Sequence, residues 1–120
     1  AGDERAQLAF DVLVRGVSGA VAAMTTSLRG LDALVFSAGA GERSGPLRDA
    51  VCARLGQLGV ALDEERNARD AEQIGAAGAP VAVLVVPAGE EIVVARQTAQ
   101  VLRQPGWQAK EAAPHRAKWV

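Results

Sequence analysis

The sequence predicts a small α/β domain with a mostly parallel sheet flanked by helices. Two short apolar segments, 31–36 (LDALVF) and 81–86 (VAVLVV), have the length and composition of buried strands. Helical patterns precede the first segment, separate the two and follow the second. A strand–helix–strand order with buried strands predicts parallel pairing through a right-handed crossover. The chain has 120 residues, 49% of them apolar, which suffices for one core.

Residues 3–28 have the period of an amphipathic helix. Asp3 and Glu4 place negative charge where a helix N-terminus favours it, and Gly30 is typical of a helix stop. The apolar side chains recur at three- and four-residue steps, which predicts one buried face made of Ala9, Leu13, Val17, Ala20, Val21, Met24 and Leu28.

A glycine-rich loop, 37–44 (SAGAGERS), follows the first strand and leads into a second helix capped by Ser44. Gly56 and Gly59 are expected to close this helix. Residues 60–62 could be a short extended piece, and the polar, Gly- and Ala-rich segment 63–79 is predicted to be a loop. The apolar stripe of the second helix comprises Leu47, Val51, Leu55 and Leu58.

The strand at 81–86 should be buried on both faces, and a last helix runs from Gly89 to about Leu102. We therefore predict one incomplete domain at 1–103 and a tail at 104–120, which shows no clear period. Two or three strands make a small sheet with open edges, which indicates that part of the fold is missing. The tail contains the only histidine, so no catalytic role is expected for it.

Charge and cysteine content narrow the classes of partner. The formal net charge is −1 and the basic residues are dispersed, so we expect no nucleic-acid partner. The single cysteine, Cys52, is expected to be a packed thiol in a reducing compartment. We expect no segment long enough to span a bilayer and no secretory signal, hence a soluble cytoplasmic protein.

The glycine-rich loop is the strongest local signal for a binding site. Gly39 and Gly41 permit close approach of the backbone, and the following helix start suits a phosphate group. Ser44 stands where a dinucleotide fingerprint has its third glycine, and the lysine of a Walker loop is absent, which argues against a Rossmann-type binder. A simple structural turn is the alternative.

Glu90 and Glu91 come just after the second strand and Pro87. Ligands of open α/β sheets bind beyond the carboxyl ends of the strands, so this pair and the loop are expected on one rim. A carboxylate there could hold Mg²⁺ through water, as phosphoryl transfer requires. The alternative is that both charges complement the dipole of the last helix.

These segments resemble the acetate kinase family in order and spacing. Residues 36–44 (FSAGAGERS) resemble its adenosine loop F-T-[GA]-G-[IV]-G-E-N-S, and 81–96 resembles V-x-V-x-V-I-P-T-x-E-E-x-x-I-A-R. Residues 2–12 and 31–36 resemble the helix and strand before that loop. The resemblance covers roughly residues 2 to 102 and corresponds to the C-terminal portion of such an enzyme.

The resemblance implies a ribonuclease H-like domain of the actin and hexokinase type. It implies phosphoryl transfer between ATP and acetate or another short-chain carboxylate with Mg²⁺, and a homo-oligomer, because the family usually dimerises through this region. Glu90 matches the family's magnesium-associated glutamate. The adenosine pocket would be lined by Gly39, Ala40 and Arg43, with Gly41 and Glu42 completing the loop.

The chain also departs from the family pattern. Ala40 replaces Ile or Val, Arg43 replaces Asn, and Ala88-Gly89 replaces the residues before the glutamates. The acetate pocket and the catalytic arginines, aspartate and histidine have no counterpart, so no catalytic residue is assigned and the chain alone is expected to be inactive. The alternative function is a degenerate oligomerising module that has lost nucleotide binding.

Overall fold

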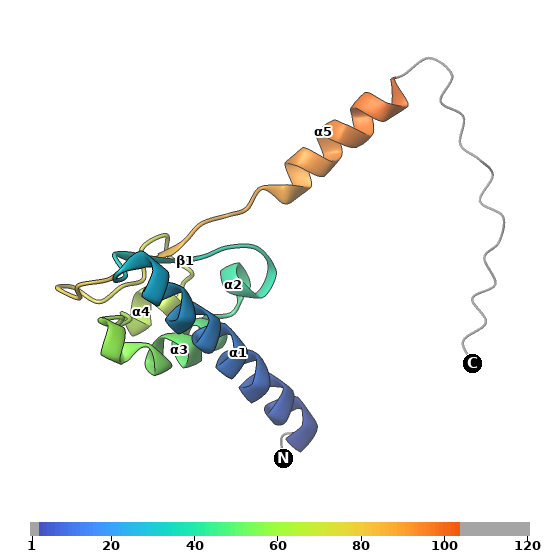
Figure 1. The fold of residues 1–120 in the computed structure, drawn as a ribbon. Coiled ribbons are helices and arrows are strands. Elements are labelled where there is room, and N and C mark those ends of the chain that lie inside the picture. Colours follow the sequence, from blue (N-terminus) through green and yellow to red (C-terminus); the bar gives the residue numbers. More distant parts are fainter. Residues whose placement is uncertain (1–2, 104–120) are drawn as a thin grey trace. The chain divides into compact units, whose positions relative to one another are not determined.

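The structure, a computed structural model, describes residues 3–103 (Figure 1). These residues form two compact units that divide between Ala88 and Gly89. The predicted tail and its histidine lie outside the described residues. The first unit contains α1 (Glu4–Leu28), β1 (Ala33–Phe36), α2 (Gly39–Arg43), α3 (Gly45–Arg54), a 3₁₀ helix (Gly56–Leu58), α4 (Glu64–Ala68) and β2 (Ala82–Val85), and the second contains α5 (Glu90–Leu102).

The two strands pair in parallel, as the sequence predicts. Their register runs from Ala33 opposite Ala82 to Phe36 opposite Val85. The expectation that the second strand is buried on both faces is wrong. Val83 and Val85 are buried, whereas the intervening Leu84 faces the other way and is only partly covered. Within the described residues the sheet has two strands, and the side chains of Phe36, Val83 and Val85 on one face are buried.

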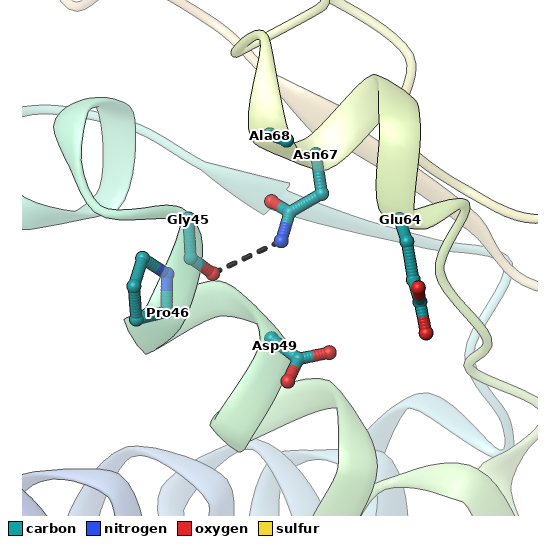
Figure 2. A pocket seen from close by; sticks show the side chains of 6 residues that line it. All are labelled: Gly45, Pro46, Asp49, Glu64, Asn67 and Ala68. Carbon is teal, nitrogen blue, oxygen red and sulfur yellow. Dashed lines mark hydrogen bonds between the residues drawn. The ribbon is translucent and has the colours of Figure 1, made fainter.

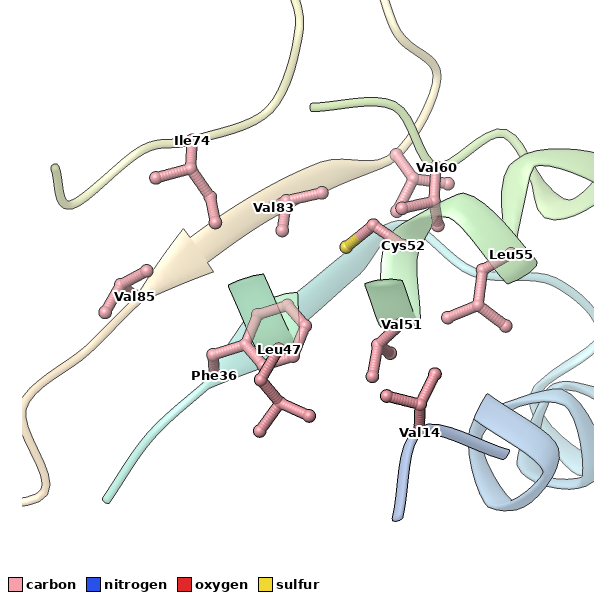
Figure 3. Packing of buried hydrophobic residues seen from close by; sticks show 11 residues of the cluster. Val14, Phe36, Leu47, Val51, Cys52, Leu55, Val60, Ile74, Val83 and Val85 are labelled. Atoms are coloured by element: carbon pink, nitrogen blue, oxygen red, sulfur yellow. The ribbon is translucent and has the colours of Figure 1, made fainter. Parts of the chain in front are cut away.

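The core lies between this sheet, α3 and part of α1. Ser44 caps α3 as predicted, because its Oγ accepts a hydrogen bond from the Leu47 N–H at 3.3 Å. Figure 3 shows the core side chains converging from the helices, the strands and the segments between them. The buried apolar residues are Val14, Phe36, Leu47, Val51, Cys52, Leu55, Val60, Ile74, Val81, Val83 and Val85.

The long helix α1 forms where the sequence predicts it, with Asp3 as its cap. Its buried face differs from the prediction, because Leu13, Met24 and Leu28 are exposed. Val17 and Val21 pack toward the core as predicted, together with Phe10 and Val14, which the predicted stripe omits. Apolar side chains lie on more than one side of this helix, so periodicity alone identified only part of the buried stripe.

The composition of α1 also bears on the expectation that no segment could span a bilayer. By length and composition alone, this 25-residue helix is long and apolar enough to do so. A mostly buried core helix of a soluble protein and an N-terminal signal sequence pass the same test, and only 11% of the apolar window of α1 is buried. One face of α1 packs against α3.

Segment 63–79 is more ordered than the loop that its composition predicts. Helix α4 begins in it, capped by Asp63, whose Oδ1 accepts from the Arg66 N–H at 3.0 Å. Isolated bridges then join Leu62 to Gly75 and Gln73 to Leu84. Tertiary pairing to β2 therefore overrides the polar, Gly- and Ala-rich composition of this segment.

Candidate functional site

The glycine-rich loop turns sharply at the end of β1. Ala38 adopts φ 57° and ψ 152°, a conformation that side-chain-bearing residues rarely take. Helix α2 begins at the next residue, so the five residues assigned to the adenosine loop form one helical turn rather than an open loop. The Ala38 carbonyl accepts from the N–H groups of Gly41 and Glu42 at 3.0 and 3.3 Å and closes this turn.

The Glu42 carboxylate faces the protein's own backbone. Its Oε1 accepts hydrogen bonds from the N–H groups of Ala38 at 2.6 Å and of Ala88 at 2.8 Å. Ala38 follows β1 and Ala88 follows β2, so one oxygen joins the two segments that leave the carboxyl ends of the paired strands. The Glu42 carboxylate thus bonds backbone groups of its own chain, and its place in an adenosine pocket stays a prediction.

A buried arginine that was not among the residues predicted from the sequence supports the loop. Arg48 lies in α3 with its side chain 0% exposed. Its Nη1 donates to the carbonyl oxygens of Gly41 and Glu42 at 2.9 and 2.8 Å. The sequence does carry a signal that Arg48 is buried, because it lies four residues before Cys52 and therefore on the apolar face of its helix.

The other side of the Arg48 guanidinium is held by α4 and the residues after it. Nε donates to Oδ1 of Asn67 at 2.8 Å, Nη2 donates to the Asn67 carbonyl at 2.9 Å, and Nη2 also forms an ion pair with Asp70. The Asn67 amide donates in turn to the Gly45 carbonyl at 3.0 Å. Arg48 therefore connects the loop, the start of α3 and α4 in one network.

A pocket of about 260 Å³ lies beside this network, between α3 and α4. Figure 2 shows Asp49 and Glu64 at its sides and the Asn67 amide directed to Gly45. The residues that line it are Gly45, Pro46, Asp49, Glu64, Asn67 and Ala68, none of which was assigned to a site from the sequence. Among residues 3–103, no three His, Cys, Asp or Glu side chains come together as a metal site would require.

Glu90 is the first residue of α5 and shares its first turn with Glu91. Gly89 precedes it with φ 64°, a left-handed conformation that favours glycine. This position suits a carboxylate at the positive end of the helix dipole, as the structural alternative expects. Glu90 belongs to the second unit and the glycine-rich loop to the first, so its role as a magnesium ligand stays a prediction.

Cys52 is buried, as predicted for a packed thiol. Burial raises the pKa of the thiol to about 12, with a further increase from the Asp49 carboxylate and an opposing effect of Arg48. The pKa of the folded state thus exceeds that of the unfolded chain, about 8.5, so the neutral thiol contributes stability below that pH. This contribution is lost as the pH rises from there toward 12.

We therefore expect the free energy of unfolding to fall at alkaline pH, by up to about 1.4 kcal/mol per pH unit from this group. Few other side chains titrate between pH 8 and pH 10.5, because the chain has no tyrosine and its lysines are Lys110 and Lys118. Urea unfolding of the wild type and Cys52→Ala at pH 8 and pH 10.5 measures the effect. Equal declines in both proteins would show that Cys52 does not cause it.

Comparison with known proteins gives a consistent result. A model of the acetokinase family matches residues 1–96. The acetate kinase of Leifsonia xyli subsp. xyli is 47% identical over 104 residues, and that of Heliobacterium modesticaldum is 46% identical over 103 residues. These alignments cover 84% and 85% of the chain and 26% of each relative.

Solved structures agree with the sequence comparison. A propionate kinase from Francisella tularensis superposes with a TM-score of 0.71 at 29% identity, covering 80% of the chain and 25% of that structure. The acetate kinase of Porphyromonas gingivalis gives 0.69 at 31% identity, covering 85% of the chain and 26% of that structure. The chain thus spans about a quarter of the length of the proteins it matches.

Proposed function

The chain belongs to the acetokinase family, and from that premise we propose that it supplies part of the nucleotide site of an acetate or propionate kinase. The predicted fold class is confirmed, because its structural neighbours are acetate and propionate kinases with the actin- and hexokinase-like fold. The parent enzyme would transfer a phosphoryl group between ATP and a short-chain carboxylate.

The observation that carries this proposal is the junction at Glu42. The glycine-rich loop after β1 and the segment after β2 meet at one carboxylate oxygen, at the edge of the sheet where α/β folds bind ligands. Gly39 and Ala40 would contact the adenosine, and Arg43 stands where the family has an amide. Phosphoryl transfer depends on positioning and charge neutralisation, and a fixed loop would contribute to the positioning.

Mg²⁺ fits the chemistry of Glu90, because this ion keeps several waters and takes one or two carboxylates. When bound with ATP, it would neutralise charge on the phosphate oxygens. The groups that would hold acetate and promote transfer belong to the remaining three quarters of the family's length. We therefore propose that this chain binds nucleotide but does not catalyse transfer by itself.

Calorimetry of the purified chain with ATP, in the presence and absence of Mg²⁺, tests this proposal. We expect saturable binding of ATP–Mg²⁺ that weakens about fivefold in Glu90→Ala, roughly 1 kcal/mol. Glu65→Ala is the matched control, because Glu65 is an exposed acidic residue in the first turn of α4. Absence of binding by the wild type would contradict the nucleotide role, and equal weakening in both variants would contradict the role of Glu90.

An association module is the second candidate, and the exposure of α5 favours it. This helix buries none of its residues, and Ile92, Val93 and Val94 are exposed. Surfaces of this kind mark contacts with another chain when they are contiguous. Sedimentation velocity would then show a stable homo-oligomer, together with no affinity for ATP in calorimetry. A monomer would contradict this candidate.

A further inference from the structure

We propose that Glu42 is a positioning residue that ties the glycine-rich loop to the segment leading into Glu90, and so couples nucleotide binding to magnesium binding. The inference rests on the proposed function and deepens it. Glu42 acts in this role through backbone groups of its own chain, without contacting either ligand.

The tie consists of two hydrogen bonds to one oxygen. Glu42 Oε1 accepts from the Ala38 N–H at 2.6 Å and from the Ala88 N–H at 2.8 Å. Bonds of this kind to an ionised carboxylate are short and stronger than bonds between neutral groups. The segments that carry the two donors leave the same end of the sheet, because Phe36 and Val85 form the last pair of the parallel register.

The backbone of Glu42 is itself held by hydrogen bonds. The buried Arg48 side chain binds the Glu42 carbonyl at 2.8 Å, while the Glu42 N–H binds the Ala38 carbonyl. The backbone of Glu42 is therefore fixed at both its carbonyl and its N–H. The rare positive φ of Ala38 is maintained by the same residue, which bonds both the N–H and the carbonyl of Ala38.

Ala88, which donates the second of these hydrogen bonds, lies close in sequence to Glu90, the predicted magnesium ligand. Ala88 is separated from Glu90 only by Gly89, which has a left-handed backbone conformation. Anchoring Ala88 to the loop therefore fixes where the segment that carries Glu90 begins. Loss of the anchor would free that segment while leaving both Glu90 and the loop glycines unchanged.

The first part of the test needs no nucleotide. Amide hydrogen exchange and ¹⁵N spectra report the N–H groups of Ala38 and Ala88 directly in the wild type, Glu42→Ala and Glu42→Gln. We expect about tenfold faster exchange at both amides in Glu42→Ala, since a bond to a charged group is lost. Glu42→Gln keeps an oxygen acceptor in the same place and should retain most of the protection. Unchanged exchange at Ala88 in Glu42→Ala would overturn the tie.

The second part compares ATP affinity with and without Mg²⁺ in the same proteins. We expect Glu42→Ala to lower the affinity for ATP in the presence of Mg²⁺ by about fivefold more than it lowers the affinity for ATP alone. Glu42→Gln should preserve that gain although it removes the charge, and Glu65→Gln is the exposed control. Equal losses with and without Mg²⁺ would show that Glu42 acts on the nucleotide only and would overturn the coupling.

The two proposals fail in different ways. If the wild type binds no ATP in either condition, the proposed function and the magnesium coupling fall together, while the exchange rates still decide whether Glu42 ties the two segments. If the wild type binds ATP–Mg²⁺ and Glu42→Ala binds it with the same dependence on Mg²⁺, the proposed function stands and the coupling is overturned.

Discussion

Replacing Arg48 with methionine is expected to lower the free energy of unfolding by about 3–5 kcal/mol, the usual cost of breaking a buried charged network by removing one partner. The guanidinium is fully buried and donates to the carbonyls of Gly41, Glu42 and Asn67, to the Asn67 side chain and to Asp70. Methionine fills part of the volume but supplies none of these donors, so the carbonyls of Gly41 and Glu42 lose the hydrogen bonds from Arg48.

Urea unfolding followed by far-ultraviolet circular dichroism measures this loss. Arg48→Lys should be intermediate, because an ammonium group cannot reproduce the planar fork of donors. Arg54→Met is the matched control, since Arg54 lies on the same helix and is exposed. If Arg48→Met lost no more stability than this control, the network would be structurally unimportant.

Replacing Ile74 with alanine is expected to lower the free energy of unfolding by about 2–5 kcal/mol, the range for truncating a buried isoleucine. Ile74 is 0% exposed and packs in the core above β2 (Figure 3). Its backbone is also fixed, because its N–H donates to the Val83 carbonyl at 2.9 Å and its carbonyl accepts from Asp63 at 2.9 Å. The surroundings therefore cannot collapse easily into the cavity.

The same urea experiment applies, with Ile92→Ala as the control for this substitution. Ile92 is 58% exposed on α5, so its truncation should change stability by no more than about 0.5 kcal/mol. Equal effects of the two substitutions would mean that segment 63–79 does not belong to the core.

The strands, their parallel pairing and the cap of α3 were predictable from the sequence. Segments 31–36 and 81–86 are short apolar runs bounded by Gly and Pro, and that pattern depends on burial by neighbouring elements. Ser44 could be predicted because capping is a local interaction between a side chain and the next turn. Each of these features is encoded within a few residues.

Features that depend on distant contacts were not predictable in this way. The polar composition of segment 63–79 conceals Ile74, which is buried only because β2 pairs beside it. The correct stripe of α1 depends on where α3 lies, and Leu13 and Val14 are equally apolar in sequence. Local patterns cannot distinguish two apolar faces of one helix.

The candidate site was predictable in identity but not in geometry. The glycine-rich loop stands out by composition, and its similarity to the acetate kinase motif assigned Gly39 to Arg43. The sequence could not show that Glu42 bonds Ala88, because those residues are far apart along the chain. Nor could it show that Arg48 is the support of the loop, since arginine in a helix is usually exposed.

The parallel pairing of β1 with β2 has a consequence for biosynthesis. A chain made from its N-terminus completes β1, α3 and α4 before the ribosome has added Ala82, the first residue of β2. During that interval the edge of β1 that pairs with β2 has no native partner, and the core lacks Val83 and Val85. Nascent chains that stall before β2 should therefore be substrates for chaperones and proteases.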